Sequence, residues 1–333
     1  MKINFLTFSP NENSGSYRIW VRDLSRTLNE IKCDSKIFTS VKELILEKDV
    51  DVIILCKSAF ESADEIKKHL PEATIGAINI PCNFFNNSID FVIVGSPEEY
   101  ISMSYYDNVF IYPLIERKFE SIKIKKHEEK DTLDFCFHGH YPHLFKFEPF
   151  LKEAIEFFDK NIKKVKIKVI TGNKEFKWKA GRPNVDIKMF SYDENFVDIV
   201  QSCDIGLVPN VIDIRLFSKD IQKITSVDFG LYDTDYFLRM KNKTNAGRAY
   251  VFYQLGIPVI HDISPSSFEL MSKTDYTICA HDHLSYIREF KKISDHNLRN
   301  EIAESNKKMF EKHYNPHIHA NKLLQKIQKL REE

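Results

Sequence analysis

Two histidines flank a glycine at the end of an apolar run near the middle of the chain. The segment Phe137-His138-Gly139-His140 closes a run of β-forming residues that starts near residue 133. Open α/β sheets bind ligands at the carboxyl ends of their strands, so His138 and His140 are candidate proton-transfer groups. Gly139 would let a ligand approach the backbone closely. Structural histidines are the alternative, and no metal site is predicted because no cysteine or carboxylate cluster stands near the His-x-His pair.

A second group of polar residues precedes the apolar run that ends at Gly256. Lys243, Asn245 and Arg248 stand where a helix is expected to begin. Basic side chains oppose the positive end of the helix dipole, so their presence there favours a bound anion. A diphosphate would suit Arg through paired hydrogen bonds and Lys through its charge. A solvated first helical turn is the alternative.

Other polar segments follow further predicted strands. Gly15, Ser16 and Arg18 open the helix after the first strand, where backbone N–H groups either hold an anion or form a simple tight turn. The remaining candidate donor-binding residues come after later strands and are Asn210, His261, Ser266 and Glu269. Ser266 lies in a serine-rich helix start, and Glu269 is equally consistent with an ordinary carboxylate in a first helical turn.

Composition excludes several classes of protein. The 333 residues carry 48 basic and 48 acidic side chains, so the formal net charge is zero. A nucleic-acid-binding protein normally has a basic excess, so no nucleic-acid partner is predicted. An aromatic content of 13% supplies core material, which argues against disorder. No apolar run is long enough to span a membrane, and six singly scattered cysteines indicate a reducing, cytoplasmic compartment.

Strand and helix patterns alternate through both halves of the chain, which predicts an α/β protein with two doubly wound, Rossmann-like domains. The predicted strands are 2–7, 35–40, 51–56, 75–80, 91–94, 109–112, 133–138, 165–171, 185–190, 204–208, 257–260 and 276–279. The predicted helices are 17–31, 146–160, 193–202, 245–255, 281–292, 298–313 and 316–331. A charged stretch at 116–131 lacks either period and predicts a linker. We therefore expect domains at 1–125 and 126–315, an insert at 211–243 and a terminal helix at 316–333.

Together these segments resemble the GT-B glycosyltransferases, in particular the large group 1 family of bacterial polysaccharide and lipopolysaccharide glycosyltransferases. The resemblance covers nearly the whole chain and is carried by the segments 14–18, 137–140, 200–210 and, most specifically, 243–260. It implies a C-terminal helix that crosses back to the first domain and a first domain that binds the acceptor. It also implies a nucleotide-diphosphate sugar as co-substrate on the second domain. No cofactor is expected and no metal is required, because a helix end and basic side chains can stabilise a leaving diphosphate.

The sequence departs from the family at its usual catalytic positions. Many retaining members carry two glutamates eight residues apart, and here those positions hold Lys243 and Val251. No general base identifies itself from the sequence. The candidate catalytic residues are His138, His140 and, in the insert, Asp213.

The expected function is a glycosyltransferase of the hexosyl-transferring type that acts on a glycan or lipid-linked acceptor in bacterial surface polysaccharide biosynthesis. The protein would be cytoplasmic, either free or peripherally associated with the cytoplasmic face of the inner membrane. The basic stretch 160–182 suits either a solvated strand face or an anionic membrane. Two alternatives remain open, a sugar-nucleotide epimerase on the same fold and a non-catalytic glycosyltransferase-like partner subunit.

Overall fold

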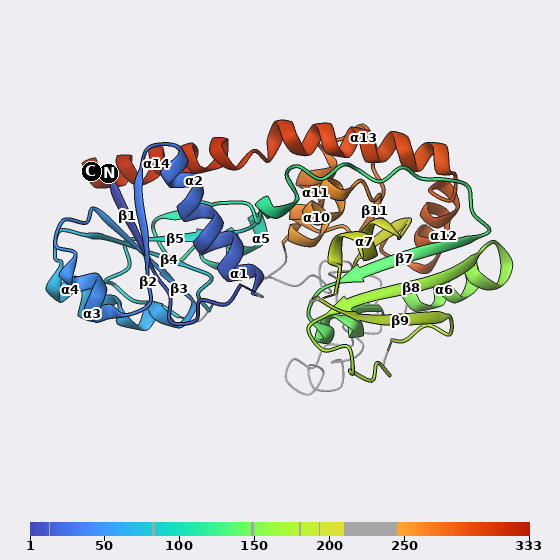
Figure 1. Ribbon diagram of the computed structural model, residues 1–333, viewed down its shortest axis with the longest axis horizontal. Helices are drawn as coiled ribbons and strands as arrows, with labels where there is room; N and C mark the ends of the chain where they lie inside the picture. Colours follow the sequence, from blue (N-terminus) through green and yellow to red (C-terminus); the bar gives the residue numbers. More distant parts are fainter. Residues whose placement is uncertain (13, 82–83, 148–149, 180, 193, 210–244) are drawn as a thin grey trace, which may run out of the picture. The chain divides into compact units, whose positions relative to one another are not determined.

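The chain divides into two compact units, each built on a parallel β-sheet (Figure 1). The computed structural model describes residues 1–12, 14–81, 84–147, 150–179, 181–192, 194–209 and 245–333. One unit comprises Met1–Glu120 together with Glu311–Glu333, and the other comprises Ser121–Phe310. Two αβ units, with the terminal segment belonging to the first, confirm the predicted fold class.

The first unit contains a six-stranded parallel sheet in the order β2-β1-β3-β4-β5-β6. Its strands are β1 (Lys2–Leu6), β2 (Asp34–Phe38), β3 (Val52–Cys56), β4 (Thr74–Ile78), β5 (Phe91–Val94) and β6 (Val109–Ile111). Every residue of β3 and β5 is buried. Their continuous apolar sequences predicted this, because such runs are typical of parallel strands covered on both faces. All six predicted strands of this unit are confirmed, with shifts at their ends of at most two residues.

The helices of the first unit are mostly short. They are α1 (Gly15–Tyr17), α2 (Leu24–Glu30), α3 (Val41–Leu46), α4 (Ala63–His69), α5 (Pro97–Ser102) and α14 (Pro316–Glu332), with 3₁₀ turns at Lys57–Ser62 and Arg117–Phe119. The sequence predicts one helix over 17–31, but a π-helical stretch at Arg18–Asp23 separates α1 from α2. A π turn is wider than an α turn, yet Trp20, Leu24 and Leu28 all remain buried.

The terminal helix α14 packs within the first unit, beside α2 (red and blue in Figure 1). His317 Nε2 lies 2.8 Å from Glu30 Oε2, and the Lys326 ammonium lies 5.5 Å from the centroid of the Phe110 ring. The side chain of Asn315 caps the helix start by accepting the backbone N–H of His317 at 2.9 Å. The predicted return of the terminal helix to the first domain is confirmed.

The second unit contains a five-stranded parallel sheet in the order β11-β10-β7-β8-β9. Its strands are β7 (Thr132–His138), β8 (Lys164–Thr171), β9 (Asp186–Ser191), β10 (Ile205–Val208) and β11 (Val259–His261). Its helices are α6 (Phe150–Asn161), α7 (Phe196–Gln201), α10 (Gly247–Leu255), α11 (Pro265–Met271), α12 (His283–Lys292) and α13 (His296–His313), with a 3₁₀ stretch at Tyr141–Phe147.

One strand predicted for this unit is wrong. Within 276–279, only Cys279 forms a bridge, to His261. The hydroxyl of Thr274 bonds to both the carbonyl and the N–H of Tyr276, at 2.7 and 3.3 Å. Tyr276 therefore lies in a local turn, and pairing with β11 is limited to the bridge at Cys279.

The two faces of the second sheet are covered differently. On one face, the ring of Phe135 in β7 packs against those of Phe158 in α6 and Phe290 in α12, with centroids 6.5 and 4.9 Å apart. On the other face, Phe252 of α10 lies so close to β10 that a Cβ atom on Gly206 would come within 2.7 Å of its ring. Residues 249–255 are all buried, so the surrounding core fixes the position of α10.

The charged stretch predicted as a linker contains the boundary between the units, at residues 120 and 121. Beyond that boundary it is bound to the second unit. Lys125 Nζ lies 2.9 Å from Asp204 Oδ1, and His127 Nε2 donates to the carbonyl of Gly256 at 2.9 Å. The side chains of Asp204 and His127 are fully buried. Its charged residues are therefore part of a buried polar network as well as a connection.

Candidate functional site

The carboxyl ends of the second sheet lie at one edge, because its strands run parallel. β7 ends at His138, β10 at Val208 and β11 at His261. Ligands of open α/β sheets bind in the crevice at this edge. Three of the segments that the sequence singled out therefore end at the same edge of one sheet.

Gly139 and Arg248 are brought together at this edge. Gly139 has a φ of +152°, a conformation that L side chains rarely adopt. A Cβ atom there would lie 3.4 Å from Arg248 Cδ and 3.3 Å from the ring of Phe137. The Arg248 guanidinium lies over the same ring, 5.3 Å from its centroid. Glycine is thus favoured at position 139 by the backbone φ angle and by the closeness of the Arg248 side chain.

Arg248 carries a buried positive charge at the start of α10. Burial lowers the pKa of Arg248 to about 10, and the negative charge of Asp262 acts in the opposite direction. The guanidinium therefore remains protonated at neutral pH. A positive charge in the first turn of α10 opposes the helix dipole, so an anion bound there would stabilise both.

The two histidines beside Gly139 have different surroundings. His138 is 7% exposed, donates from Nε2 to the carbonyl of Arg248 at 3.2 Å, and packs its ring against Phe252 at 4.8 Å. These contacts assign His138 to positioning the start of α10. His140 is exposed, and its ring lies 4.8 Å from that of Tyr141. Of the two, His140 is the histidine that solvent and a substrate can reach.

Asn245 precedes α10 and shapes its start. Its side-chain oxygen accepts the backbone N–H of Gly247 at 3.2 Å. This bond uses one of the N–H groups that a helix start leaves without a partner. Asn245 therefore acts on the helix start itself.

His261 is a packing residue in this structure. Its side chain is 1% exposed, and its Nε2 lies 2.8 Å from the hydroxyl of Tyr253 in α10. Burial lowers the pKa of His261 to about 3, so the ring is neutral at physiological pH. The donor contact expected from the sequence is corrected to a bond between β11 and α10.

The segment after β11 forms the expected serine-capped helix. Ser264 caps α11, and Ser266 is buried in its first turn. Glu269 points to solvent, with Oε1 2.6 Å from Lys273 Nζ one turn later. The structure thus favours the ordinary surface role for Glu269 that the sequence left open.

The predicted anion site in the first unit is only partly consistent with its surroundings. Within the described residues, the atom that comes near a Cβ built on Gly15 belongs to Arg18, at 3.9 Å, so there is room beside this glycine. The hydroxyls of Ser14 and Ser16 bond to each other at 3.0 Å. Arg18 Nε lies 2.7 Å from the buried carboxylate of Glu116, so its charge is already compensated.

Lys57 is a residue that the sequence analysis missed. It directly follows β3, has a φ of +52°, and donates from Nζ to Ser14 Oγ at 3.0 Å. A lysine in the left-handed region is strained, and such strain concentrates at functional sites. The sequence signal that could have identified Lys57 is its position directly after the continuous apolar run of β3.

Three predicted residues fall outside the described part of the chain. These are Asn210, Asp213 and Lys243, together with the whole insert 211–243.

No family model and no curated protein sequence matches the chain. Solved structures do match it over nearly its full length. The O-GlcNAc transferase of Thermobaculum terrenum, as a K341M mutant, is 8% identical with a TM-score of 0.61, over 99% of this chain and 67% of that one. A DNA-modifying β-glucosyltransferase, determined with and without uridine diphosphoglucose, is 13% identical with a TM-score of 0.60, over 98% and 99%. HepE of Anabaena in complex with UDP is 10% identical with a TM-score of 0.58, over 99% and 100%.

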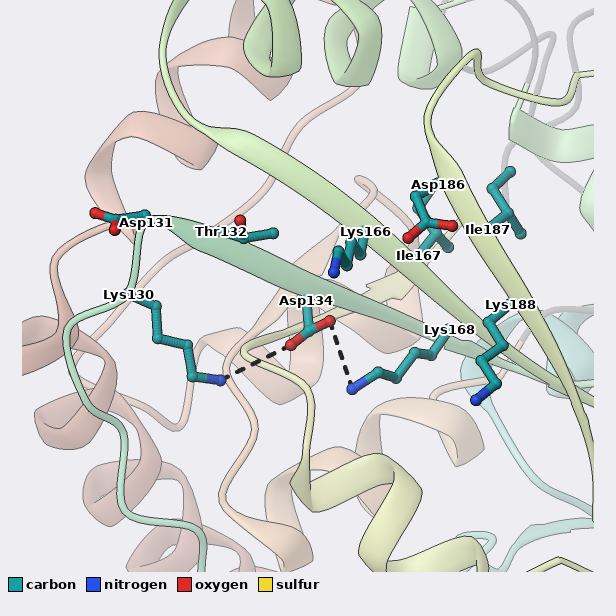
Figure 2. A pocket seen from close by; sticks show the side chains of 10 residues that line it. All are labelled: Lys130, Asp131, Thr132, Asp134, Lys166, Ile167, Lys168, Asp186, Ile187 and Lys188. Carbon is teal, nitrogen blue, oxygen red and sulfur yellow. Dashed lines mark ion pairs between the residues drawn. The ribbon is translucent and has the colours of Figure 1, made fainter.

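The chain has the GT-B fold. In this GT-B chain, a hollow lies on the second sheet, away from its carboxyl edge. It measures about 740 Å³ and is lined by the first halves of β7, β8 and β9. Figure 2 shows Asp134 at its centre, between Lys130 at 3.8 Å and Lys168 at 3.4 Å. Because four lysines and three aspartates line it together, this hollow has the character of a solvated sheet face.

Two further properties bear on the chemistry of the GT-B chain. Among the described residues, no three His, Cys, Asp or Glu side chains come together as a metal ion would require. Within the same residues, no helix is both long and apolar enough to cross a bilayer.

Proposed function

We propose that the protein is a nucleotide-sugar-dependent glycosyltransferase whose donor, a UDP-sugar, binds at the carboxyl edge of the second sheet. The contact between Arg248 and Gly139 carries this proposal. It puts a cation, the start of a nine-residue helix and a backbone without a side chain at one point. Such a point offers both charge and N–H donors to a diphosphate. UDP is the nucleotide named with the GT-B structures of HepE and the β-glucosyltransferase.

The reaction needs two things from the protein. The bond between the sugar carbon and the diphosphate oxygen breaks, and Arg248 stabilises the charge that develops on the leaving diphosphate. A new bond forms from that carbon to an acceptor hydroxyl, whose proton passes to a general base. We propose His140 as that base, because it is the exposed histidine next to Gly139.

For the acceptor we propose a glycan or lipid-linked sugar in bacterial surface polysaccharide biosynthesis, on the cytoplasmic side of the membrane. The zero net charge argues against nucleic acid as the acceptor. The DNA-modifying GT-B enzyme nevertheless makes duplex DNA a necessary arm of the acceptor test.

A thermal-shift panel of UDP, GDP, ADP and CMP tests the donor, followed by hydrolysis of the corresponding sugar nucleotides. We expect UDP to raise Tm and the others to have little effect. If no nucleotide shifts Tm and no sugar nucleotide is hydrolysed, the proposal fails. Incorporation of deuterium into the donor sugar in heavy water would instead identify an epimerase. Stable association with a catalytic homologue, without nucleotide binding, would identify a partner subunit.

A further inference from the structure

A separate cavity lies beside the edge strand of the second sheet. It measures about 370 Å³ and is formed by the connection between β8 and β9, which closes against β9 itself. Its apolar lining comes from Phe176 and Trp178 of the connection and from Ile187 and Met189 of β9. Its polar lining consists of Lys177, Lys179 and Arg182.

Aromatic packing holds the connection in place. The ring of Phe176 lies 4.5 Å from that of Tyr141, and the ring of Trp178 meets that of Phe147 edge-on at 4.9 Å. Trp178 is only 5% exposed. The cavity is therefore preformed, since its apolar wall is anchored in the core of the unit.

The three cations of this cavity have no acidic partner among the described residues. They belong to the basic stretch 160–182, four of whose lysines do have one. Those pairs are Lys163 with Glu129, Lys164 with Asp159, Lys168 with Asp134 and Lys174 with Glu194. The hollow in Figure 2 likewise contains its own carboxylates, whereas no acidic side chain from the described residues lines this cavity. Within the described residues, three cations without an acidic partner therefore surround one apolar floor.

We propose that this cavity binds the phosphate headgroup of an anionic lipid, with the first apolar carbons of the lipid on Ile187 and Met189. A phosphate supplies the negative charge that would pair with Lys177, Lys179 and Arg182. The apolar chain of the lipid would contact Ile187 and Met189. The volume is at the lower end of ligand sites, so it suits one headgroup rather than an extended polymer. This binding is independent of the proposed donor chemistry and would hold the second unit at an anionic membrane.

Tryptophan fluorescence gives a direct test. The chain has two tryptophans, and Trp20 lies in the core of the first unit, so W20F protein reports on Trp178 alone. We expect phosphatidylcholine vesicles containing phosphatidic acid to change its emission in a saturable way, and pure phosphatidylcholine vesicles to leave it unchanged. Co-sedimentation of wild-type protein with the same vesicles gives the second measurement, which needs no tryptophan substitution.

The matched variants are two triple substitutions of equal charge. K177Q/K179Q/R182Q should weaken vesicle binding at least tenfold, because each basic residue near an anionic surface contributes about fivefold in affinity. K160Q/K291Q/K308Q removes three exposed lysines elsewhere on the same unit and should change binding by less than about twofold. Equal losses in the two variants would overturn the proposal.

Soluble probes separate the sources of the phosphate. Inorganic phosphate and a single-stranded oligonucleotide should not reproduce the change in Trp178 emission. If either does so as effectively as the vesicles, the apolar floor is not used and the lipid proposal is wrong. Nucleotide thermal shifts of K177Q/K179Q/R182Q should equal those of the wild type, so failure here is distinguishable from failure of the glycosyltransferase proposal.

Discussion

The side chain of Arg248 passes directly over Gly139, at a distance where a methyl group on the glycine would touch it at 3.4 Å. Gly139 follows β7, whereas Arg248 lies in the first turn of α10. Their contact sets the position of one cation at the carboxyl edge of the sheet. The donor-site predictions below depend on that contact.

Removing the charge of Arg248 should weaken the binding of UDP. R248Q loses charge-assisted hydrogen bonds, each of which contributes about 1.5–3 kcal/mol, so we expect a Kd at least tenfold higher. R248K keeps the charge and should recover part of the affinity. Isothermal titration with UDP measures both, and K291Q on the exposed end of α12 is the control. Unchanged UDP affinity in R248Q would remove the basis of the donor site.

A side chain at residue 139 should be costly, whereas one at residue 172 should not. G139A combines a strained backbone with contacts to Phe137 and Arg248, so we expect a loss of about 1–3 kcal/mol in the free energy of unfolding. Among the described residues, Gly172's sequence neighbours aside, none comes within 4 Å of a Cβ built on Gly172, so G172A should be within about 0.5 kcal/mol of wild type. Urea unfolding of the two variants provides the comparison, and equal stabilities would contradict the assigned packing.

Substitution of the two histidines in segment 137–140 should affect different properties: the transfer rate for His140 and the stability for His138. H140Q removes the proposed base from an exposed position, so transfer should slow by about 10²- to 10⁴-fold with stability unchanged. H138Q disturbs a buried contact to the carbonyl of Arg248 and should cost about 1–3 kcal/mol of stability. Rates per folded molecule and unfolding curves separate the effects. Full transfer activity in H140Q would exclude it as the base.

Stability should fall as the solution is acidified below about pH 6.5, in part because of His261. Burial lowers the pKa of His261 to about 3, so between these values the unfolded chain binds a proton that the folded chain does not. This one group should contribute a slope of about 1.4 kcal/mol per pH unit, with the full stability present above pH 6.5. Urea unfolding at pH 7, 6, 5 and 4 should give a shallower slope for H261Q. Identical slopes in H261Q and wild type would contradict the prediction.

The buried carboxylate of Asp204 should be important for the stability of the second unit. Burial raises its pKa, but the adjacent His127 side chain and the charge of Lys125 outweigh this effect and hold the pKa well below its usual value. D204N leaves Lys125 without its buried partner, and such a loss costs about 3–5 kcal/mol. D186N, on the exposed face of the sheet, should stay within about 0.5 kcal/mol of wild type. Urea unfolding midpoints of D204N and D186N measure the difference, and equal midpoints would contradict the prediction.

Much of the fold was predictable from local patterns. The apolar runs of β3 and β5 predicted buried parallel strands, and the Asn315-Pro316 pair predicted the start of α14. The errors arose where a local bond or a change of winding overrides periodicity. The hydroxyl of Thr274 holds Tyr276 in a turn where a strand was predicted, and the π-helical stretch at Arg18–Asp23 interrupts the first helix.

The candidate site was predictable in its parts but not in its arrangement. The sequence by itself determined which segments end strands and begin helices, because strand and helix periods and capping residues act over a few neighbouring positions. It could not show that His138 is buried and His140 exposed, or that Arg18 pairs with Glu116 while Arg248 lies beside Gly139. Only the tertiary structure decided these questions. A side chain's role depends on what packs against it, and Glu116 and Gly139 reach these arginines only once the chain has folded.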